Sequence, residues 1–116
     1  MLCVDDKQDL RNALYDQFTN EDFDVELAED GKIALEKILS TDYDIVLLDI
    51  VMPNMTGLQV LQELRKTDKH PFIIMLSGIN ELKIAEECVK IGAKDFVQKP
   101  YEPEELLDVV IKVLGS

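Results

Sequence analysis

The sequence is poor in the residues and segments that several classes of protein depend on. It has only two cysteines, Cys3 and Cys88, which lie in apolar surroundings without CxxC spacing, so we expect reduced core thiols and no disulfide. No apolar run reaches the length of a membrane span, and residues 1–4 lead straight into acidic ones, so we expect neither a membrane anchor nor a signal peptide. These absences indicate a cytoplasmic protein.

Positive charge is scarce as well. There are 12 Lys and Arg residues against 24 Asp and Glu residues, which gives a formal net charge of -12. A surface this acidic repels a phosphate backbone, so we expect no direct binding of nucleic acid by this domain. The one histidine, His70, lies between Lys69 and Pro71 and is expected to be a solvated loop residue, so the chain has no recognisable histidine kinase function of its own.

Apolar and amphipathic segments alternate along the 116 residues, a length that fits one domain. Strands are predicted over residues 1–4, 25–28, 45–48, 72–76 and 96–97, and residues 45–48 are all aliphatic, as expected for a strand covered on both faces. Apolar residues recur at helical spacing in residues 8–20, after Gly31 through Ile38, in residues 58–66, between a capping Asn80 and Gly92, and after an opening at residues 102–105.

Five strands that alternate with five helices imply parallel pairing through right-handed crossovers. We therefore predict an α/β fold, a three-layer α/β/α sandwich around a five-stranded parallel sheet in the flavodoxin-like order 2-1-3-4-5. The predicted domain covers residues 1–116, either alone or as a part excised from a longer parent protein.

Polar side chains follow four of the predicted strands. Asp5 and Asp6 follow the first strand, Asp49 the third, Ser77 the fourth and Lys99 the fifth. The carboxyl ends of parallel strands line one crevice, so these side chains should meet there. Carboxylate oxygens suit a hard divalent cation, Mg²⁺ or Mn²⁺, with Asp6 and Asp49 as direct ligands and Asp5 holding a coordinated water.

The same set suits phosphoryl chemistry. Asp49 ends the strand most suited to the centre of the sheet, and a carboxylate can attack phosphorus to give an aspartyl phosphate. Lys99 can pair with one phosphoryl oxygen, and Ser77 can donate a hydrogen bond to another. Taken singly, Asp5 and Asp6 could form a solvated turn or cap the first helix, Lys99 could be ordinary surface charge, and Ser77 could cap the helix after it. Their joint occurrence at matching strand ends favours the site.

The ordered motifs resemble the receiver domain of bacterial two-component response regulators over essentially the whole chain. The matching parts are Val4-Asp5-Asp6, Leu48-Asp49 with Met52-Pro53 and Gly57, Ser77, Gly92-Ala93 through Phe96, and Lys99-Pro100. The resemblance implies that Asp49 is the phospho-accepting aspartate and that Asp5 and Asp6 are the acidic pair that binds Mg²⁺. It further implies the backbone carbonyl of Val51 as another ligand and Lys99 as the phosphate-contacting lysine.

The resemblance also implies a partner and a switch. A phosphohistidine of a sensor histidine kinase or of a histidine phosphotransfer protein would donate the phosphoryl group, docking against the first helix and the loop at Pro100, where the Lys99-Pro100 bond would be cis. Ser77 would then move toward the phosphoryl group and Phe96 would rotate inward. The face of the fourth helix, fifth strand and fifth helix would change shape toward an output domain or a second copy of the chain. Hydrolysis would be self-catalysed, so we expect a signalling switch and not an enzyme.

Four positions depart from the commonest receiver pattern. Ser77 stands where threonine is frequent, Gly78 where alanine is usual, Thr56 where aspartate is often found, and the apolar Val51 where many relatives are polar. None of these departures removes a residue that phosphorylation needs.

Three other functions fit parts of the pattern. A phosphatase or phosphotransferase of the haloacid-dehalogenase type needs a second acid two residues after Asp49, where Val51 stands, and a cap over its substrate. A flavodoxin-like module needs backbone and hydroxyl donors after the first strand, where acidic residues 5–9 would repel a flavin phosphate. A phosphorylation-independent, receiver-like binding module would not need the acceptor set that is complete here.

Overall fold

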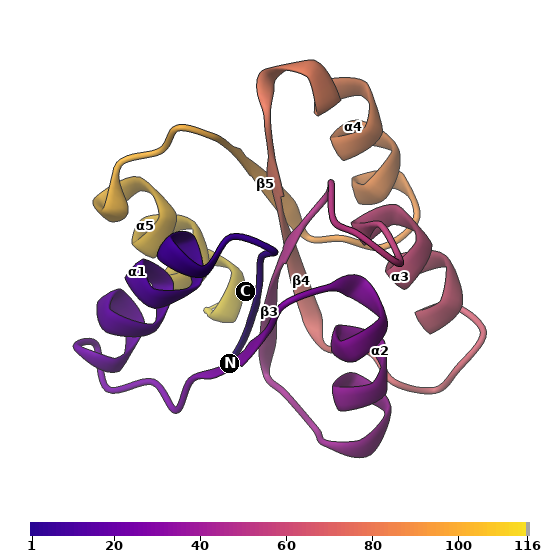
Figure 1. Ribbon diagram of the computed structural model, residues 1–116, viewed down its shortest axis with the longest axis horizontal. Helices are drawn as coiled ribbons and strands as arrows, with labels where there is room; N and C mark the ends of the chain where they lie inside the picture. The colour runs from indigo at the N-terminus through magenta and orange to yellow at the C-terminus, as the bar shows by residue number, and fades with distance from the viewer. Residues whose placement is uncertain (116) are drawn as a thin grey trace.

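The computed structural model describes residues 1–115 of the chain. Within them, the strands are β1 (Leu2–Val4), β2 (Glu26–Ala28), β3 (Ile45–Asp49), β4 (Phe72–Ser77) and β5 (Asp95–Gln98). The helices are α1 (Gln8–Thr19), α2 (Gly31–Ser40), α3 (Gly57–Leu64), α4 (Leu82–Lys90) and α5 (Pro103–Leu114), with a 3₁₀ turn η1 (Ile79–Glu81) before α4. The strands pair in parallel in the order β2-β1-β3-β4-β5, which confirms the predicted fold (Figure 1).

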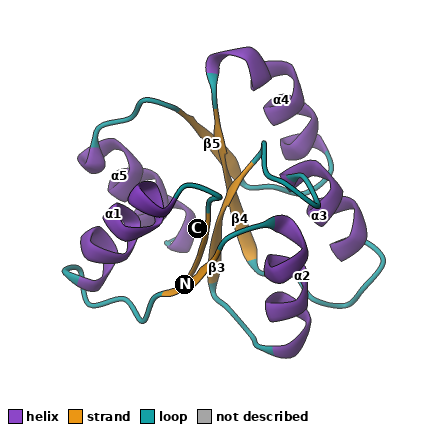
Figure 2. Cartoon of the chain, viewed as in Figure 1, coloured by secondary structure: helices purple, strands orange, loops and turns teal. Residues whose placement is uncertain are grey.

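The helices cover both faces of the sheet. Figure 2 shows α1 and α5 on one side of the strands and α2, α3 and α4 on the other. Successive side chains of β3 point to opposite faces, so Val46 and Leu48 join the core under α2 to α4, whereas Ile45 and Leu47 join the core under α1 and α5. All five residues of β3 are buried, as predicted for a strand with helices on both faces.

The two cysteines lie in these two cores. Cys3 belongs to the core under α1 and α5, and Cys88 to the core on the other side of the sheet. Both are free thiols with no exposed surface, which confirms the prediction for them. Within residues 1–115, no helix is long and apolar enough to cross a lipid bilayer.

The strand register brings the polar strand ends level with one another. Val4 of β1 is the partner of Leu48 of β3, so Asp5 follows β1 at the height of Asp49. On the other side of β3, Ser77 at the end of β4 is the partner of Gln98 of β5, and Lys99 comes next. Segments far apart in sequence therefore end at one edge of the sheet.

Several helix ends follow the predicted signals. Pro103 is the first residue of α5, and Glu104 and Glu105 lie in its first turn, near the positive end of the helix dipole. Gly92, with a φ of 137°, comes directly after the C-cap of α4. Thr56 caps α3 through a capping box: its hydroxyl accepts from the Gln59 amide at 3.2 Å, and the Gln59 side chain accepts from the Thr56 amide at 2.9 Å.

The prediction that Asn80 caps α4 was wrong. Asn80 lies inside the turn η1, and the N-cap of α4 is Glu81. The Glu81 carboxylate reaches back to accept a hydrogen bond from the Gly78 amide at 3.1 Å, which stabilises a 3₁₀ turn before the helix proper. Other boundaries differ by one or two residues: β2 begins at Glu26 and α3 ends at Leu64.

Candidate functional site

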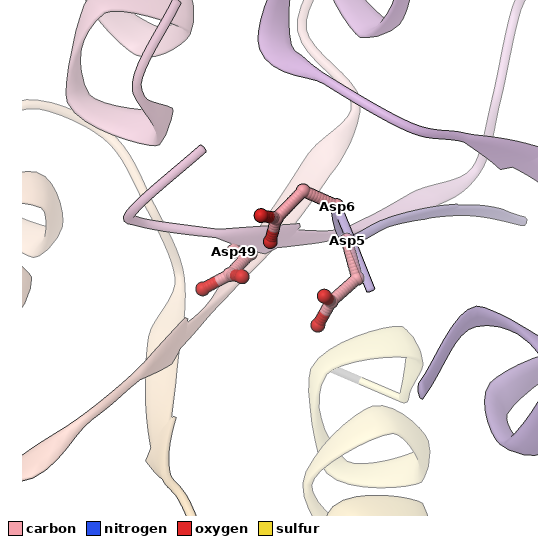
Figure 3. Close-up of side chains that lie close together, drawn as sticks. All are labelled: Asp5, Asp6 and Asp49. Carbon is pink, nitrogen blue, oxygen red and sulfur yellow. The ribbon is translucent and has the colours of Figure 1, made fainter. Parts of the chain in front are cut away.

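Three carboxylates gather at the carboxyl edge of the sheet (Figure 3). Asp5 and Asp6 follow β1 and Asp49 ends β3, and each offers an oxygen atom within 4.8 Å of the others. Asp5 and Asp49 are buried, with 1% and 4% of their surfaces exposed, whereas Asp6 is exposed. Negative charges this close repel one another strongly away from bulk water, so the cluster favours a cation. Oxygen-only ligands suit Mg²⁺ or a similar hard ion.

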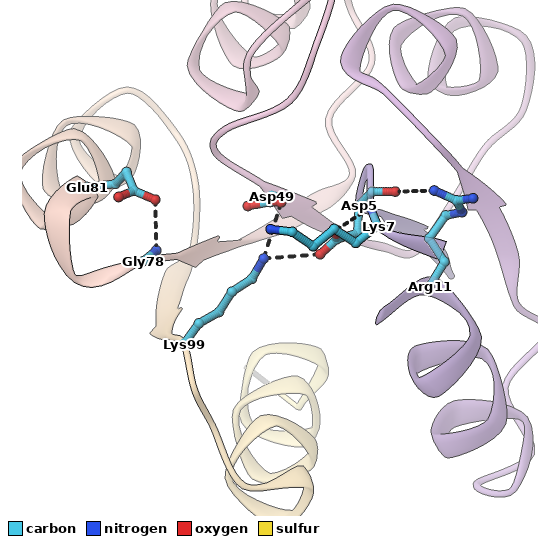
Figure 4. A network of polar contacts seen from close by, with 7 residues as sticks. All are labelled: Asp5, Lys7, Arg11, Asp49, Gly78, Glu81 and Lys99. Atoms are coloured by element: carbon cyan, nitrogen blue, oxygen red, sulfur yellow. Dashed lines mark hydrogen bonds and ion pairs between the residues drawn. The ribbon is translucent and has the colours of Figure 1, made fainter. Parts of the chain in front are cut away.

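Lys99 supplies one positive charge to this cluster (Figure 4). Its Nζ atom lies 3.1 Å from Asp5 Oδ2 and 3.2 Å from Asp49 Oδ2, so it bridges the ends of β1 and β3. The Lys99 amide donates to the Ser77 carbonyl at 2.7 Å, which holds the end of β5 against β4. The bond between Lys99 and Pro100 is cis, as predicted. The structure therefore brings Asp5, Asp6, Asp49 and Lys99 together.

The site raises the pKa of both Asp49 and Lys99, but for different reasons. Burial raises the pKa of Asp49 to about 6; Lys99 opposes this shift, and the charges of Asp5 and Asp6 add to it. Burial lowers the pKa of Lys99, but Asp49 and Asp5 outweigh burial and leave that pKa above its ordinary value. Near neutral pH the lysine is therefore cationic, and Asp49 is mostly a carboxylate held at an energetic cost.

Ser77 lies at the same edge and is fully buried. Among residues 1–115, its Oγ atom has no hydrogen-bond partner, so it does not cap the turn that follows. An unpaired buried hydroxyl costs about 1–3 kcal/mol, and buried polar groups are otherwise nearly always paired. A hydrogen-bond acceptor bound in the crevice would pair this hydroxyl, so the residues present fit a phosphoryl group.

Asp5 has two structural contacts besides Lys99. Its Oδ1 atom accepts a hydrogen bond from the Lys7 amide at 2.9 Å, and its carbonyl accepts one from Arg11 Nη1 at 2.8 Å (Figure 4). The N-cap of α1 is Lys7, so neither Asp5 nor Asp6 caps that helix. Asp5 therefore has two roles: its side chain stabilises the turn before α1, and its carboxylate is part of the acidic cluster.

The loop after Asp49 passes close to the strand that precedes it. A Cβ atom on Gly57 would lie 2.4 Å from the Asp49 carbonyl oxygen, so only glycine fits there. The Gly57 amide donates to the Ile50 carbonyl at 2.9 Å, which closes the loop. Val51, in the loop between these points, is 58% exposed.

A second tie for this loop was missed at the sequence level. Asn54, at a φ of 69°, donates through its side-chain amide to Asp30 Oδ2 at 2.8 Å. Asp30 also caps α2 by accepting from the Ile33 amide at 2.8 Å, and this bond is the main reason that its pKa is lowered. An aspartate directly before Gly31 was the available signal for the cap.

An apolar cleft of about 520 Å³ lies beside Lys99. It is lined by α1 and by the loop before α5, through Leu10, Ala13, Leu14, Gln17, Lys99, Pro100, Tyr101 and Pro103. The Gln17 side chain donates to the Pro103 carbonyl at 2.7 Å, which joins α1 to that loop. Burial, followed by the charge of Asp5, raises the pKa of Tyr101 to about 12. The sequence predicted a docking surface on the first helix and the loop at Pro100, which are the two sides of this cleft, but it singled out neither the hollow between them nor Tyr101.

Phe96 is the remaining residue of the expected switch. It lies on β5, is half-buried, and packs against the core under α2 to α4. The rotation expected of it remains a prediction.

Comparison with known proteins places this geometry in a family. Residues 1–111 match the model of the response regulator receiver domain. The chain is 36% identical to the chemotaxis protein CheY of Thermotoga maritima, covering 97% of this chain and 95% of that protein. It is 37% identical to the response regulator ArlR of Staphylococcus saprophyticus, covering 92% of this chain but only 48% of ArlR, so it spans about half the length of that relative.

Solved structures agree. The response regulator protein TrrA of Thermotoga maritima, in complex with Mg²⁺-BeF, is 34% identical and superimposes with a TM-score of 0.86, covering 97% of this chain and 96% of TrrA. This chain belongs to the response regulator receiver domain family of two-component signal transduction.

Proposed function

We propose that this domain accepts a phosphoryl group on Asp49 from the phosphohistidine of a sensor histidine kinase or a histidine phosphotransfer protein. The observation that carries the proposal is the contact of one lysine with two buried carboxylates, Lys99 with Asp5 and Asp49, beside the unpaired hydroxyl of Ser77. Such a relay operates in the cytoplasm, where the buried free thiols stay reduced.

The transfer step needs little covalent chemistry from the protein. A carboxylate oxygen of Asp49 forms a bond to phosphorus while the phosphorus–nitrogen bond breaks, and the imidazole leaves and takes up a proton. Lys99 pairs with one phosphoryl oxygen, and the Ser77 hydroxyl donates to another, so alignment and charge neutralisation do most of the work. Hydrolysis by water reverses the modification, and the domain acts as a switch with no outside substrate to turn over.

Mg²⁺ or Mn²⁺ would be held by Asp5, Asp6 and Asp49, with the backbone carbonyl of Val51 as a further ligand. When bound, the ion neutralises charge on the carboxylates and on the phosphoryl oxygens. The proximity of three carboxylates, within 4.8 Å of one another, supports this assignment. The complex of the relative TrrA with Mg²⁺-BeF supports it independently.

The phosphodonor would dock in the apolar cleft between α1 and the loop before α5. The cleft has Lys99 among its lining residues, so a partner seated there places its histidine next to the acceptor site. Its lining is mainly apolar, through Leu10, Leu14, Pro100 and Pro103, and this suits the apolar face of a partner helix.

The output would be read from the face of α4, β5 and α5. Phosphorylation of Asp49 draws Ser77 toward the phosphoryl group, and Phe96 turns into the space that Ser77 leaves. This face would then bind an output domain or a second copy of the chain. The longer relative ArlR, in which the match covers 48% of the protein, supports an attached output domain; the match to CheY supports a stand-alone regulator equally.

Intact-mass spectrometry tests the acceptor assignment. The domain is incubated with a small phosphodonor, with and without Mg²⁺. We expect a gain of one phosphoryl group that requires Mg²⁺ and is abolished in Asp49→Asn, whereas Asp44→Asn, at an exposed acid before β3, gains it normally. An unchanged gain in Asp49→Asn would refute Asp49 as acceptor. No gain in the native chain would favour a phosphorylation-independent binding module, and sustained release of phosphate from outside esters would favour a phosphatase.

A further inference from the structure

A second cleft lies at the opposite edge of the sheet from the acidic cluster. It has a volume of about 490 Å³ and lies between the C-terminal ends of α3 and α4, which are neighbours on one face of the sheet (Figure 1). It is lined by Leu61, Leu64, Arg65, Lys69, His70, Pro71, Phe72, Ile73, Gly92 and Lys94. Phe72 begins β4 and Ser77 ends it, so at about 3.3 Å per residue the two sites are roughly 16 Å apart along the strand.

The charge of this cleft is the reverse of the charge of the chain. Three cationic residues, Arg65, Lys69 and Lys94, line it together with the one histidine, His70, and none of the described residues in its lining is acidic. In the whole chain, acidic residues outnumber basic ones by 24 to 12. A cleft lined by one sign of charge between low-dielectric walls concentrates ions of the other sign.

Two of the cations contact only neutral groups among the interactions described. Arg65 Nη1 donates to the Ile91 carbonyl at 2.6 Å, beside Gly92. Lys94 Nζ lies 5.2 Å from the centroid of the Phe72 ring. Lys69 pairs with Asp42 at 2.7 Å, but that carboxylate is 90% exposed. Neutral partners fix the positions of Arg65 and Lys94 without cancelling their charges.

We propose that this cleft binds a small organic anion. Its phosphate or carboxylate group pairs with Arg65 and Lys94, and its apolar body packs on the floor formed by Leu61, Leu64 and Phe72. The volume falls within the range of roughly 300–1,000 Å³ that small-molecule sites occupy. A cleft of this size encloses a small molecule, whereas an acidic protein or a nucleic acid backbone would need a longer basic surface.

Two-dimensional NMR of the ¹⁵N-labelled domain tests this site, with phenyl phosphate as the probe. EDTA in the buffer keeps divalent cations away from the acidic cluster, so the result does not depend on Asp49 chemistry. We expect saturable shifts of the Gly92 and Lys94 amides. Lys94→Gln and Arg65→Gln should each weaken binding by roughly tenfold through the loss of a charged hydrogen-bond donor, and the dispersion of each spectrum reports that the variant is folded.

The matched control is Lys83→Gln, which removes the same charge from an exposed position of α4 outside the cleft and should bind like the native chain. Phenylacetate should bind at the same amides, inorganic phosphate more weakly, and benzyl alcohol hardly at all. Equal losses in Lys83→Gln and Lys94→Gln, or shifts confined to α1 and the loop before α5, would overturn the proposal. So would equal binding of benzyl alcohol, or occupation of the cleft by a second copy of the chain, seen as concentration-dependent line widths without probe.

Discussion

Replacing Asp49 by asparagine should stabilise the metal-free domain at neutral pH. Asp49 is the proposed acceptor, and its pKa is raised from 3.8 to about 6, mainly by burial. A buried acid whose pKa is raised on folding lowers stability wherever it is ionised, because the folded state must hold a charge that the unfolded state holds more easily. Asparagine has nearly the same shape and no charge, and Asp5 remains 3.1 Å from Lys99 as its partner.

The magnitude follows from the two pKa values. Their difference, from 3.8 to about 6, corresponds to about 3 kcal/mol at 1.36 kcal/mol per pKa unit. Above the folded pKa, at pH 7.5, the full amount is expressed, and Asp49→Asn should be more stable by about 3 kcal/mol. As the pH falls through 6 toward 3.8, the native side chain takes up its proton. At pH 4 the advantage of the variant should therefore be below about 1 kcal/mol.

Urea unfolding in EDTA at pH 7.5 and pH 4, followed by circular dichroism, measures both differences. Asp44→Asn, an exposed acid before β3, is the control and should change stability by less than about 0.5 kcal/mol. Added Mg²⁺ should stabilise the native chain much more than it stabilises the Asp49→Asn variant, since the variant lacks one of the three carboxylates. A neutral or destabilising effect of Asp49→Asn at pH 7.5, or an equal gain at both pH values, would refute the electrostatic account of the site.

Three other substitutions and treatments probe the same structure. Ser77→Ala removes a buried hydroxyl with no partner among the described residues. Urea unfolding in EDTA should therefore show no loss of stability beyond the small cost of the cavity that the missing oxygen leaves. Mass spectrometry should show that the variant gains the phosphoryl group more slowly. Gly57→Ala places a Cβ 2.4 Å from a backbone oxygen of β3 and should cost several kcal/mol or prevent folding. Gly115→Ala, with its nearest atom at 3.3 Å, should cost far less in thermal unfolding. Burial raises the pKa of Cys3 to about 12 and that of Cys88 to about 11, so neither thiol should react with a disulfide reagent until urea unfolds the chain, and rapid native-state labelling would contradict their burial.

The main features of the fold and of the acidic cluster were predictable because they depend on local patterns. Aliphatic runs that end in Asp5, Asp49 and Ser77 mark both the strand and its carboxyl end. Parallel pairing then leaves little freedom, because every strand must point the same way and the ends must meet at one edge. That edge brings Lys99 close to Asp5 and Asp49, but its direct ion pairs with the two carboxylates were not predicted.

Features built by side chains from several elements could not be read in the same way. The tie between Asp30 and Asn54 joins the start of α2 to the loop after β3, and no periodicity encodes that contact. The two clefts likewise depend on distances between elements. One depends on how far α1 lies from the loop before α5, and the other on how far α3 lies from α4. Asn80 has the composition of a helix cap, but the longer side chain of Glu81 reaches the Gly78 amide instead. Local propensity cannot decide between two caps when one of them depends on reach.

The costs that the structure stores are concentrated at the proposed acceptor site. Asp49 is a buried carboxylate whose pKa is raised, and the hydroxyl of Ser77 has no partner among the described residues. A bound cation would relieve the first cost, and a bound phosphoryl group would relieve the second. Both ligands would therefore bind more tightly here than at a site whose carboxylates and hydroxyl are already paired. A ligand shifts a conformational equilibrium only by its difference in affinity for the two states. In the proposed switch the Ser77 hydroxyl would supply such a difference: it would gain a hydrogen bond by moving to the phosphoryl group, and that movement would free the space that Phe96 would fill.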